Sequence, residues 1–124
     1  MSDEVREAFP GYRAGVVVAT GLVNGPAVPV AVDPAPLDHP HLQAWRDAFR
    51  AFGAKRYSCS AEALIRRADE FPAINRLVDL YNAVSMAHAV PVGGEDLDHV
   101  VGPVRLVFAT GDEPFDGGDP PKAG

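Results

Sequence analysis

Polar side chains that disfavour helices recur at helical spacing in the stretch 73–100 and could carry chemistry. If this stretch is a helix, Asn75, Asp79 and Asn82 lie within about 60° of one another, because successive residues turn by about 100°. The three together cost roughly 1 to 2 kcal/mol relative to Ala in a helix interior. Such a stripe is expected either as a buried hydrogen-bonding scaffold or as the wall of a binding site.

A cation and two consecutive glycines accompany this stripe. Arg76 lies at the start of the same stretch, and Gly93 and Gly94 follow it. Neither glycine carries a Cβ and both tolerate positive φ, so their backbone could approach a ligand closely. The alternative interpretation is a structural turn at the C-terminal end of the helix.

Two short motifs in this stretch match a known family in residue type and spacing. They are Asn75-Arg76-x-Val78-Asp79-x-x-Asn82-x-Val84 and Pro91-Val92-Gly93-Gly94-Glu95-Asp96-Leu97-Asp98. Together they resemble the central motif of the B3/B4 domain, and weaker agreement extends over residues 11–115. That domain is the tRNA-editing module of the bacterial phenylalanyl-tRNA synthetase β subunit, and the second motif is more similar to a free-standing, synthetase-like group.

The resemblance implies an editing-type hydrolase that acts in trans on aminoacyl-tRNA or a related aminoacyl ester. Such a site needs a dry slot for the amino-acid side chain, donors for the ester carbonyl and an oriented water. In the family, residues matching Arg76 and Asn82 line the editing pocket, so we assign the catalytic role to this pair. The expected substrate-binding set, in which Asp79 braces Arg76, consists of Asp79, Gly93, Gly94 and Asn75.

One position departs from the family pattern. The synthetase domain carries a histidine two residues after the proline that matches Pro91, whereas this chain has Gly93. The departure removes an imidazole that could orient water or the terminal ribose. The alternative hypothesis is therefore a noncatalytic B3/B4-like module that binds an amino-acid-like ligand or a protein partner.

The charge balance limits how the chain could bind RNA. A net charge of −6 argues against tight nonspecific binding to phosphates, which requires a basic surface. Positive charge is concentrated within 22 residues, at Lys55-Arg56, Arg66-Arg67 and Arg76. These residues form either a basic edge for one tRNA acceptor end or ordinary solvated helix charges.

The sequence offers little support for a metal, a cofactor or a covalent nucleophile. His39 and His41 flank a proline and have no third ligand nearby, so we expect no metal site. Cys59 could act as a nucleophile only if His88 or His99 lay beside it. The chain has no P-loop, dinucleotide fingerprint or HExxH motif, and we expect no cofactor.

The composition predicts one cytoplasmic domain. With 124 residues, of which 47% are hydrophobic, the chain can bury one modest core. The longest uninterrupted apolar run is too short to span a membrane, and residues 1–10 lack the features of a signal peptide. The single cysteine fits a reducing compartment.

Periodicity predicts an α+β fold, with a β-sheet packed against two or three helices, and the family resemblance implies that this fold corresponds to the first part of a B3/B4 domain. Helices are expected over residues 41–52, 60–70 and 73–89, and strands over 14–20 and 104–109. Residues 26–32 are expected to be either an edge strand or merely extended, because Pro26 and Pro29 each remove a backbone donor. For the third helix, we expect an inward apolar face made of Ile74, Leu77, Val78, Tyr81, Val84 and Ser85.

The C-terminal end of the chain is expected to be irregular. Residues 111–124 have almost nothing to bury, so we predict a flexible tail. Because the B3/B4 domain ordinarily continues with further strands, we interpret residues 1–124 as a single domain that is incomplete at its C-terminus. A partner chain or a homo-oligomer would then complete the sheet.

Overall fold

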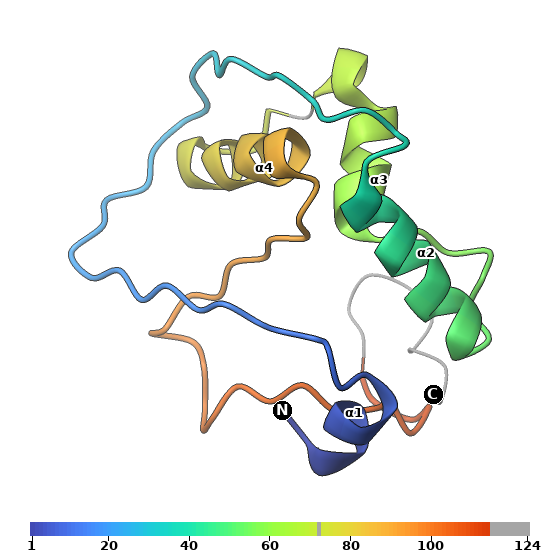
Figure 1. Cartoon of the computed structure of the whole chain (residues 1–124). Helices are drawn as coiled ribbons and strands as arrows, with labels where there is room; N and C mark the ends of the chain where they lie inside the picture. Colours follow the sequence, from blue (N-terminus) through green and yellow to red (C-terminus); the bar gives the residue numbers. More distant parts are fainter. Residues whose placement is uncertain (72, 115–124) are drawn as a thin grey trace. The chain divides into compact units, whose positions relative to one another are not determined.

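The computed structural model describes residues 1–71 and 73–114 (Figure 1). Its regular elements are α1 (Asp3–Ala8), α2 (Pro40–Ala51), α3 (Ser60–Arg66), the 3-10 turn η1 (Ala68–Glu70) and α4 (Arg76–His88). The chain divides into two compact units. Unit 1 comprises Met1–Val18 and Asp96–Gly124, and unit 2 comprises Ala19–Glu95. No helix within the described residues is long and apolar enough to cross a membrane.

The predicted α+β fold is wrong for the described part of the chain, because that part contains helices and no strand. Residues 14–20, 26–32 and 104–109 run extended without forming a ladder. A strand exists only when its backbone bonds to a neighbouring strand. Within 104–109, only the Leu106 carbonyl accepts a backbone bond among the described residues, from the Ser2 N–H at 2.9 Å.

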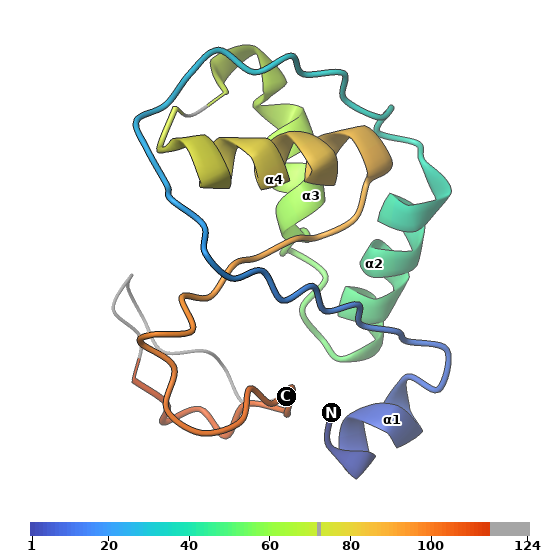
Figure 2. The same ribbon diagram turned by 90° about the vertical axis from the view of Figure 1, so that its left-hand side faces the viewer.

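The core of unit 2 lies among α2, α3 and α4. Figure 2 shows α4 crossing α3, and these two helices are in contact. The buried core residues are Ala35, Leu42, Cys59, Ala61, Ile65, Met86 and Ala89. This small core gives α4 a fixed position on α3, so its side chains can be placed with respect to the rest of unit 2.

Helix α2 confirms the prediction for residues 41–52. Its core stripe is apolar, with Leu42 fully buried and Trp45 and Phe49 packed against the core. Pro40 occupies the first helical position, where its missing N–H costs nothing. Gly53 follows the helix with a φ of 81°, as expected for the glycine that ends it.

The second predicted helix is divided. Helix α3 ends at Arg66, and η1 replaces the expected last turn up to Glu70. Its N-cap is Cys59, which makes no side-chain capping bond, and Ser60 is the first helical residue, as the predicted range has it. Glu62 lies in the first turn, where a carboxylate interacts favourably with the helix dipole.

Helix α4 begins three residues later than predicted. Asn75 is its N-cap, and Arg76 is its first residue. The helix ends at His88, and its C-cap Ala89 adopts the left-handed conformation at φ 52° and ψ 44°. The Ser85 hydroxyl then donates to the Val90 carbonyl at 2.7 Å.

The predicted inward face of α4 is only partly confirmed, because Ser85 is buried and Val78 and Tyr81 are half-buried, whereas the predicted Ile74, Leu77 and Val84 are exposed. The buried residues of this helix are Asp79, Ser85 and Met86. The aliphatic stripe is exposed to the outside of unit 2, with exposed fractions of 59% at Ile74, 41% at Leu77, 48% at Leu80 and 53% at Val84. The polar residues can be buried because Asp79 and Ser85 each form a hydrogen bond to nearby backbone.

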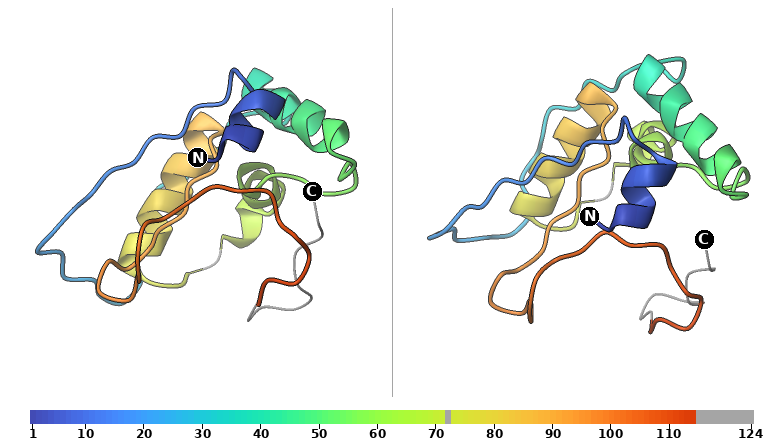
Figure 3. Two further views of the ribbon diagram at one scale, coloured as in Figure 1. Left: turned by 90° about the horizontal axis from the view of Figure 1, so that it is seen from below. Right: turned by 60° about the horizontal axis from the view of Figure 1, so that its bottom comes forward.

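Unit 1 is built around α1. Ser2 caps this helix by accepting from the Val5 N–H at 3.3 Å, and Val5 is buried. The Phe9 and Phe108 rings lie 6.4 Å apart, so the helix is linked to the segment that runs through Leu106. The left view of Figure 3 shows α1 and the segment 96–114 from below. Of the predicted flexible tail, residues 115–124 lie outside the described part of the chain.

Candidate functional site

The first three N–H groups of α4 are all hydrogen-bonded. The Arg76 N–H donates to the Gly25 carbonyl at 3.0 Å, and the Leu77 N–H donates to Oδ1 of Asn24 at 3.1 Å. The Val78 N–H donates to Oδ1 of Asn75 at 2.9 Å. Asn75, which we predicted as a substrate-binding residue, is therefore placed as an N-cap, and these amides are not available to a ligand.

Asp79 forms a hydrogen bond with the segment that precedes α4. This residue is 1% exposed, and its Oδ1 accepts from the Ile74 N–H at 3.0 Å. We expected this carboxylate to brace Arg76, but no ion pair joins the two within residues 1–71 and 73–114. Asp79 thus shapes the start of the helix from inside unit 2.

Arg76 and Asn82, the predicted catalytic pair, lie on either side of Asp79. Six residues of helix separate them by about 9 Å along the axis and about 120° around it. Arg76 is exposed and Asn82 is half-buried. Neither side chain forms a hydrogen bond with another residue in the part of the chain that the structure describes.

Two hollows adjoin the N-terminal half of α4. The smaller, of about 180 Å³, is lined by Leu22, Val23, Asn24, Arg76, Leu77 and Leu80. The larger, of about 420 Å³, is lined by Ala27, Val28, Pro29, Val30, Phe71, Ala73 and Asp79. The structure thus places Arg76 and Asp79 in different hollows, and Asn82 lines neither.

The two glycines after α4 have different surroundings. A Cβ built on Gly94 would lie 3.1 Å from Cε2 of Tyr81, so this residue packs closely against the ring. A Cβ on Gly93 would have no atom within 4 Å, which leaves its backbone open to approach. The left-handed residue that ends α4 is Ala89, so neither glycine serves as the helix C-cap.

The second half of the PVGGEDLD motif closes a turn. Oδ1 of Asp96 accepts from the Asp98 N–H at 3.1 Å, and its Oδ2 lies 2.9 Å from Nδ1 of His99. The Asp98 N–H, followed by His99, lowers the pKa of the Asp96 carboxyl below its ordinary value. This part of the motif therefore has a structural role that local hydrogen bonds explain.

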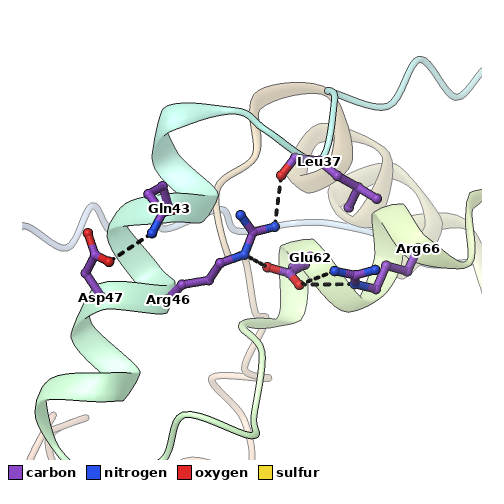
Figure 4. Close-up of polar contacts among 6 residues, drawn as sticks. All are labelled: Leu37, Gln43, Arg46, Asp47, Glu62 and Arg66. Atoms are coloured by element: carbon purple, nitrogen blue, oxygen red, sulfur yellow. Dashed lines mark hydrogen bonds and ion pairs between the residues drawn. The ribbon is translucent and has the colours of Figure 1, made fainter.

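A buried carboxylate that the sequence analysis did not identify joins α2 to α3 (Figure 4). Oε1 of Glu62 lies 2.8 Å from Nε of Arg46, and its Oε2 lies 3.0 Å from Nη2 of Arg66. The Arg46 guanidinium also donates to the Leu37 carbonyl at 2.9 Å. The signal in the sequence was the charge of Glu62 in the first turn, four residues before Arg66.

Several arginines of the predicted basic edge already contact other residues of the chain. Arg66 pairs with Glu62, and Nε of Arg67 donates to the Ala63 carbonyl at 3.4 Å. The Arg56 guanidinium lies over the Tyr57 ring, 5.4 Å from its centroid. These contacts favour the interpretation of the edge as ordinary helix and loop charges, whereas Lys55 and Arg76 make no such contact within the described residues.

The paired histidines hold helices together. Nδ1 of His39 accepts from the His41 N–H at 3.1 Å and so caps α2. Nδ1 of His41 lies 3.0 Å from the His88 carbonyl, and because a carbonyl only accepts, this nitrogen must be the donor. In the described residues, no three His, Cys, Asp or Glu side chains gather as metal ligands. Cys59 is free and buried.

Comparison with known proteins identifies the family. Residues 44–122 match the family model described as the B3/4 domain. No match is found among curated proteins or among solved structures. The matched region includes α3, α4 and the PVGGEDLD motif, and it spans more than half of the 124 residues. This chain therefore belongs to the B3/4 domain family.

Proposed function

We propose that this chain binds aminoacyl esters, such as the aminoacylated 3′ end of a tRNA, and hydrolyses them in trans. The observation that supports this most strongly is the environment of Arg76. Its side chain has no partner within the described residues, and it lines a hollow whose other members are mainly aliphatic. A cation beside an apolar recess suits a ligand that has an apolar group next to a polar or anionic one.

The polar side chains of α4 divide into two groups. Asp79 and Ser85 are buried and form hydrogen bonds that hold the ends of the helix. Arg76 and Asn82 form none within the part of the chain that the structure describes. Polar side chains that the fold does not use are the ones available to a ligand, and these two match the pocket residues that the family resemblance implies.

The volume of the smaller hollow, which Arg76 lines, limits the size of the ligand that it could hold. Its volume of about 180 Å³ lies below the roughly 300 to 1,000 Å³ of pockets that enclose drug-sized ligands. In the proposed complex, it receives one amino-acid side chain and leaves the nucleotide outside. The Arg76 guanidinium then donates to the ester carbonyl and stabilises the charge that develops on this oxygen during hydrolysis.

Asn82 would contact a different part of the same substrate. The separation of about 9 Å along α4 is too large for both side chains to bind one carbonyl oxygen. Its amide could instead hold the terminal ribose or the attacking water. The open backbone at Gly93 gives that part of the substrate room to approach.

Deacylation assays test this proposal. We would incubate the protein with a panel of mischarged and D-aminoacyl-tRNAs and measure release of the amino acid. Arg76→Ala should lower the rate by 100-fold or more, the usual loss for one donor to a developing oxyanion. Arg50→Ala, an exposed arginine on α2, is the matched control and should retain the full rate. Hydrolysis no faster than in buffer across the panel would refute the enzymatic part.

A noncatalytic binding module is the second candidate, and two observations favour it. Gly93 occupies the position where the family resemblance implies a histidine, and the Asp79 carboxylate is buried and bonded to Ile74. Gly93 offers no side chain to act as a base for water, and one oxygen of the Asp79 carboxylate is already engaged by the backbone. On this hypothesis, the chain binds an aminoacyl ester analogue without turnover, and Arg76→Ala weakens binding while Arg50→Ala does not.

A further inference from the structure

The larger hollow beside α4 has no role in the function proposed above. Its volume of about 420 Å³ lies within the roughly 300 to 1,000 Å³ of pockets that enclose small organic ligands. All the residues that line it belong to unit 2, so the hollow lies within one compact unit. It is therefore large enough to hold a whole small molecule.

The wall of the larger hollow is apolar apart from one carboxylate. Asp79 is the one charged residue among the described residues that line it, and the others are Ala27, Val28, Pro29, Val30, Phe71 and Ala73. Pockets for small molecules are usually built in this way, from an apolar wall and a few polar groups that fix the orientation of the ligand. The composition of the hollow therefore fits a ligand with an apolar body and one polar group.

The two oxygens of the Asp79 carboxylate differ in their contacts. Oδ1 accepts from the Ile74 N–H at 3.0 Å, whereas Oδ2 has no partner within the described residues. In that part of the chain, no side-chain oxygen or nitrogen is both sealed from solvent and without a hydrogen bond. Oδ2 must therefore reach solvent although the residue is only 1% exposed, and the hollow that Asp79 lines provides this access.

A carboxylate oxygen beside an apolar wall favours a cation that brings its own hydrogen-bond donors. A buried charge without a partner is costly, and an ionised carboxylate only accepts hydrogen bonds. A divalent metal ion fits poorly, because calcium and magnesium require several oxygen ligands and the described wall offers one carboxylate. An organic ammonium group fits well, since its N–H groups donate to Oδ2 while its body packs against the apolar wall.

We propose that the larger hollow binds a small primary amine, with the ammonium group on Oδ2 of Asp79 and an aliphatic or aromatic body against Val28, Pro29 and Phe71. The ligand carries no free carboxylate, because no described residue of the wall is a cation that could pair with one. Amines without a carboxyl group are thus favoured over free amino acids. The site goes beyond the proposed function, because Arg76 lines the other hollow.

Isothermal titration calorimetry with phenethylamine tests this proposal. Two further probes change one group each, since phenethyl alcohol replaces the ammonium group by a hydroxyl and phenylalanine adds a carboxylate. Wild-type protein should bind the amine about tenfold more tightly than either probe, or better, because a hydrogen bond between charged groups is stronger than a neutral one. Equal affinities for the amine and the alcohol would overturn the proposal, as would no detectable binding of the amine.

Two variants test the site from different sides. Asp79→Asn removes the charge but keeps an oxygen that can accept from the Ile74 N–H, so it should lower the affinity for phenethylamine by about tenfold or more and leave the affinity for phenethyl alcohol unchanged. Val28→Trp fills the hollow from its wall, so it should weaken the binding of both probes.

Asp47→Asn is the matched control. Asp47 is an exposed carboxylate on α2 that does not line the hollow, so this variant makes the same change of net charge and should bind phenethylamine as the wild type does. Circular dichroism of each variant checks that the helices remain. Wild-type affinity for the amine in Asp79→Asn or in Val28→Trp would show that the amine binds elsewhere and would refute the site.

Discussion

The Oδ1 atom of Asn24 accepts a hydrogen bond from the Leu77 N–H at 3.1 Å, across 53 residues of sequence. Asn24 thus caps the Leu77 amide of α4 from a distant part of the chain, while Asn75, the N-cap residue, caps the Val78 amide. Losing a capping side chain usually costs about 1 kcal/mol. We expect Asn24→Ala to lower the free energy of unfolding by about 0.5 to 1 kcal/mol, measured by urea denaturation.

Asn75 and Asn82 provide a comparison within one helix. Asn75→Ala should cost about 1 kcal/mol, because it leaves the Val78 N–H without its partner. Asn82→Ala should leave stability within about 0.5 kcal/mol, because Ala is the better helix former and no side-chain hydrogen bond within the described residues is lost. Asn82→Ala should instead slow deacylation. Equal losses of stability in the two variants would contradict this division.

We expect Glu62, the buried carboxylate that pairs with Arg46 and Arg66, to contribute more to stability than Arg66 does. The Glu62 side chain is 6% exposed, whereas that of Arg66 is 55% exposed. Glu62→Ala should cost about 3 kcal/mol, because it leaves Arg46 partly buried without its charge partner. Arg66→Ala should cost only about 0.5 kcal/mol, as is usual for an exposed i,i+4 pair. Thermal and urea unfolding would check both values, and a larger loss for Arg66→Ala would refute the assignment.

Ala89 ends α4 in a left-handed conformation while fully buried. Ala89→Gly relieves about 1 kcal/mol of backbone strain, but it also removes a buried methyl group and raises the conformational entropy of the unfolded chain. Because these effects oppose one another, the free energy of unfolding should change by less than about 1 kcal/mol. Ala89→Val adds volume and a β-branched residue at positive φ, and it should cost about 3 kcal/mol. Similar unfolding midpoints for the two variants would contradict this account.

The sequence predicted the elements whose signals are local. The structure confirms the helix predicted over residues 41–52, whose apolar stripe of Leu42, Trp45 and Phe49 and following glycine are local signals. The strands depend on partners that a local pattern does not specify. Residues 14–20 have strand-forming side chains, but no described segment bonds to their backbone.

The orientation of α4 was not predictable from periodicity. The pattern identifies an aliphatic stripe through Leu77 and Val84 but does not say which surface covers it. The structure buries Asp79 and Ser85 because the Ile74 N–H and the Val90 carbonyl satisfy them. Asn75 was assigned to the site because the helix was expected to begin at residue 73, which made a cap look like an interior residue.

Glu113 gives a prediction of pH dependence. Its carboxylate accepts from the Thr110 N–H at 2.6 Å and from the Gly111 N–H at 2.9 Å. These bonds, with the Thr110 N–H as the largest cause, lower the pKa of Glu113 from 4.5 to about 2. Because the folded pKa is depressed, the turn is stabilised above pH 4.5, and this stabilisation is lost as the pH falls towards 2.

Carboxyl-carbon NMR titration measures this directly. The Glu113 signal should titrate near pH 2, and the Thr110 and Gly111 amide protons should shift with the same midpoint, since both donate to this carboxylate. In Glu113→Gln, the amide protons should no longer titrate with that midpoint. If Glu113 titrated near 4.5, the turn would not hold its carboxylate in solution.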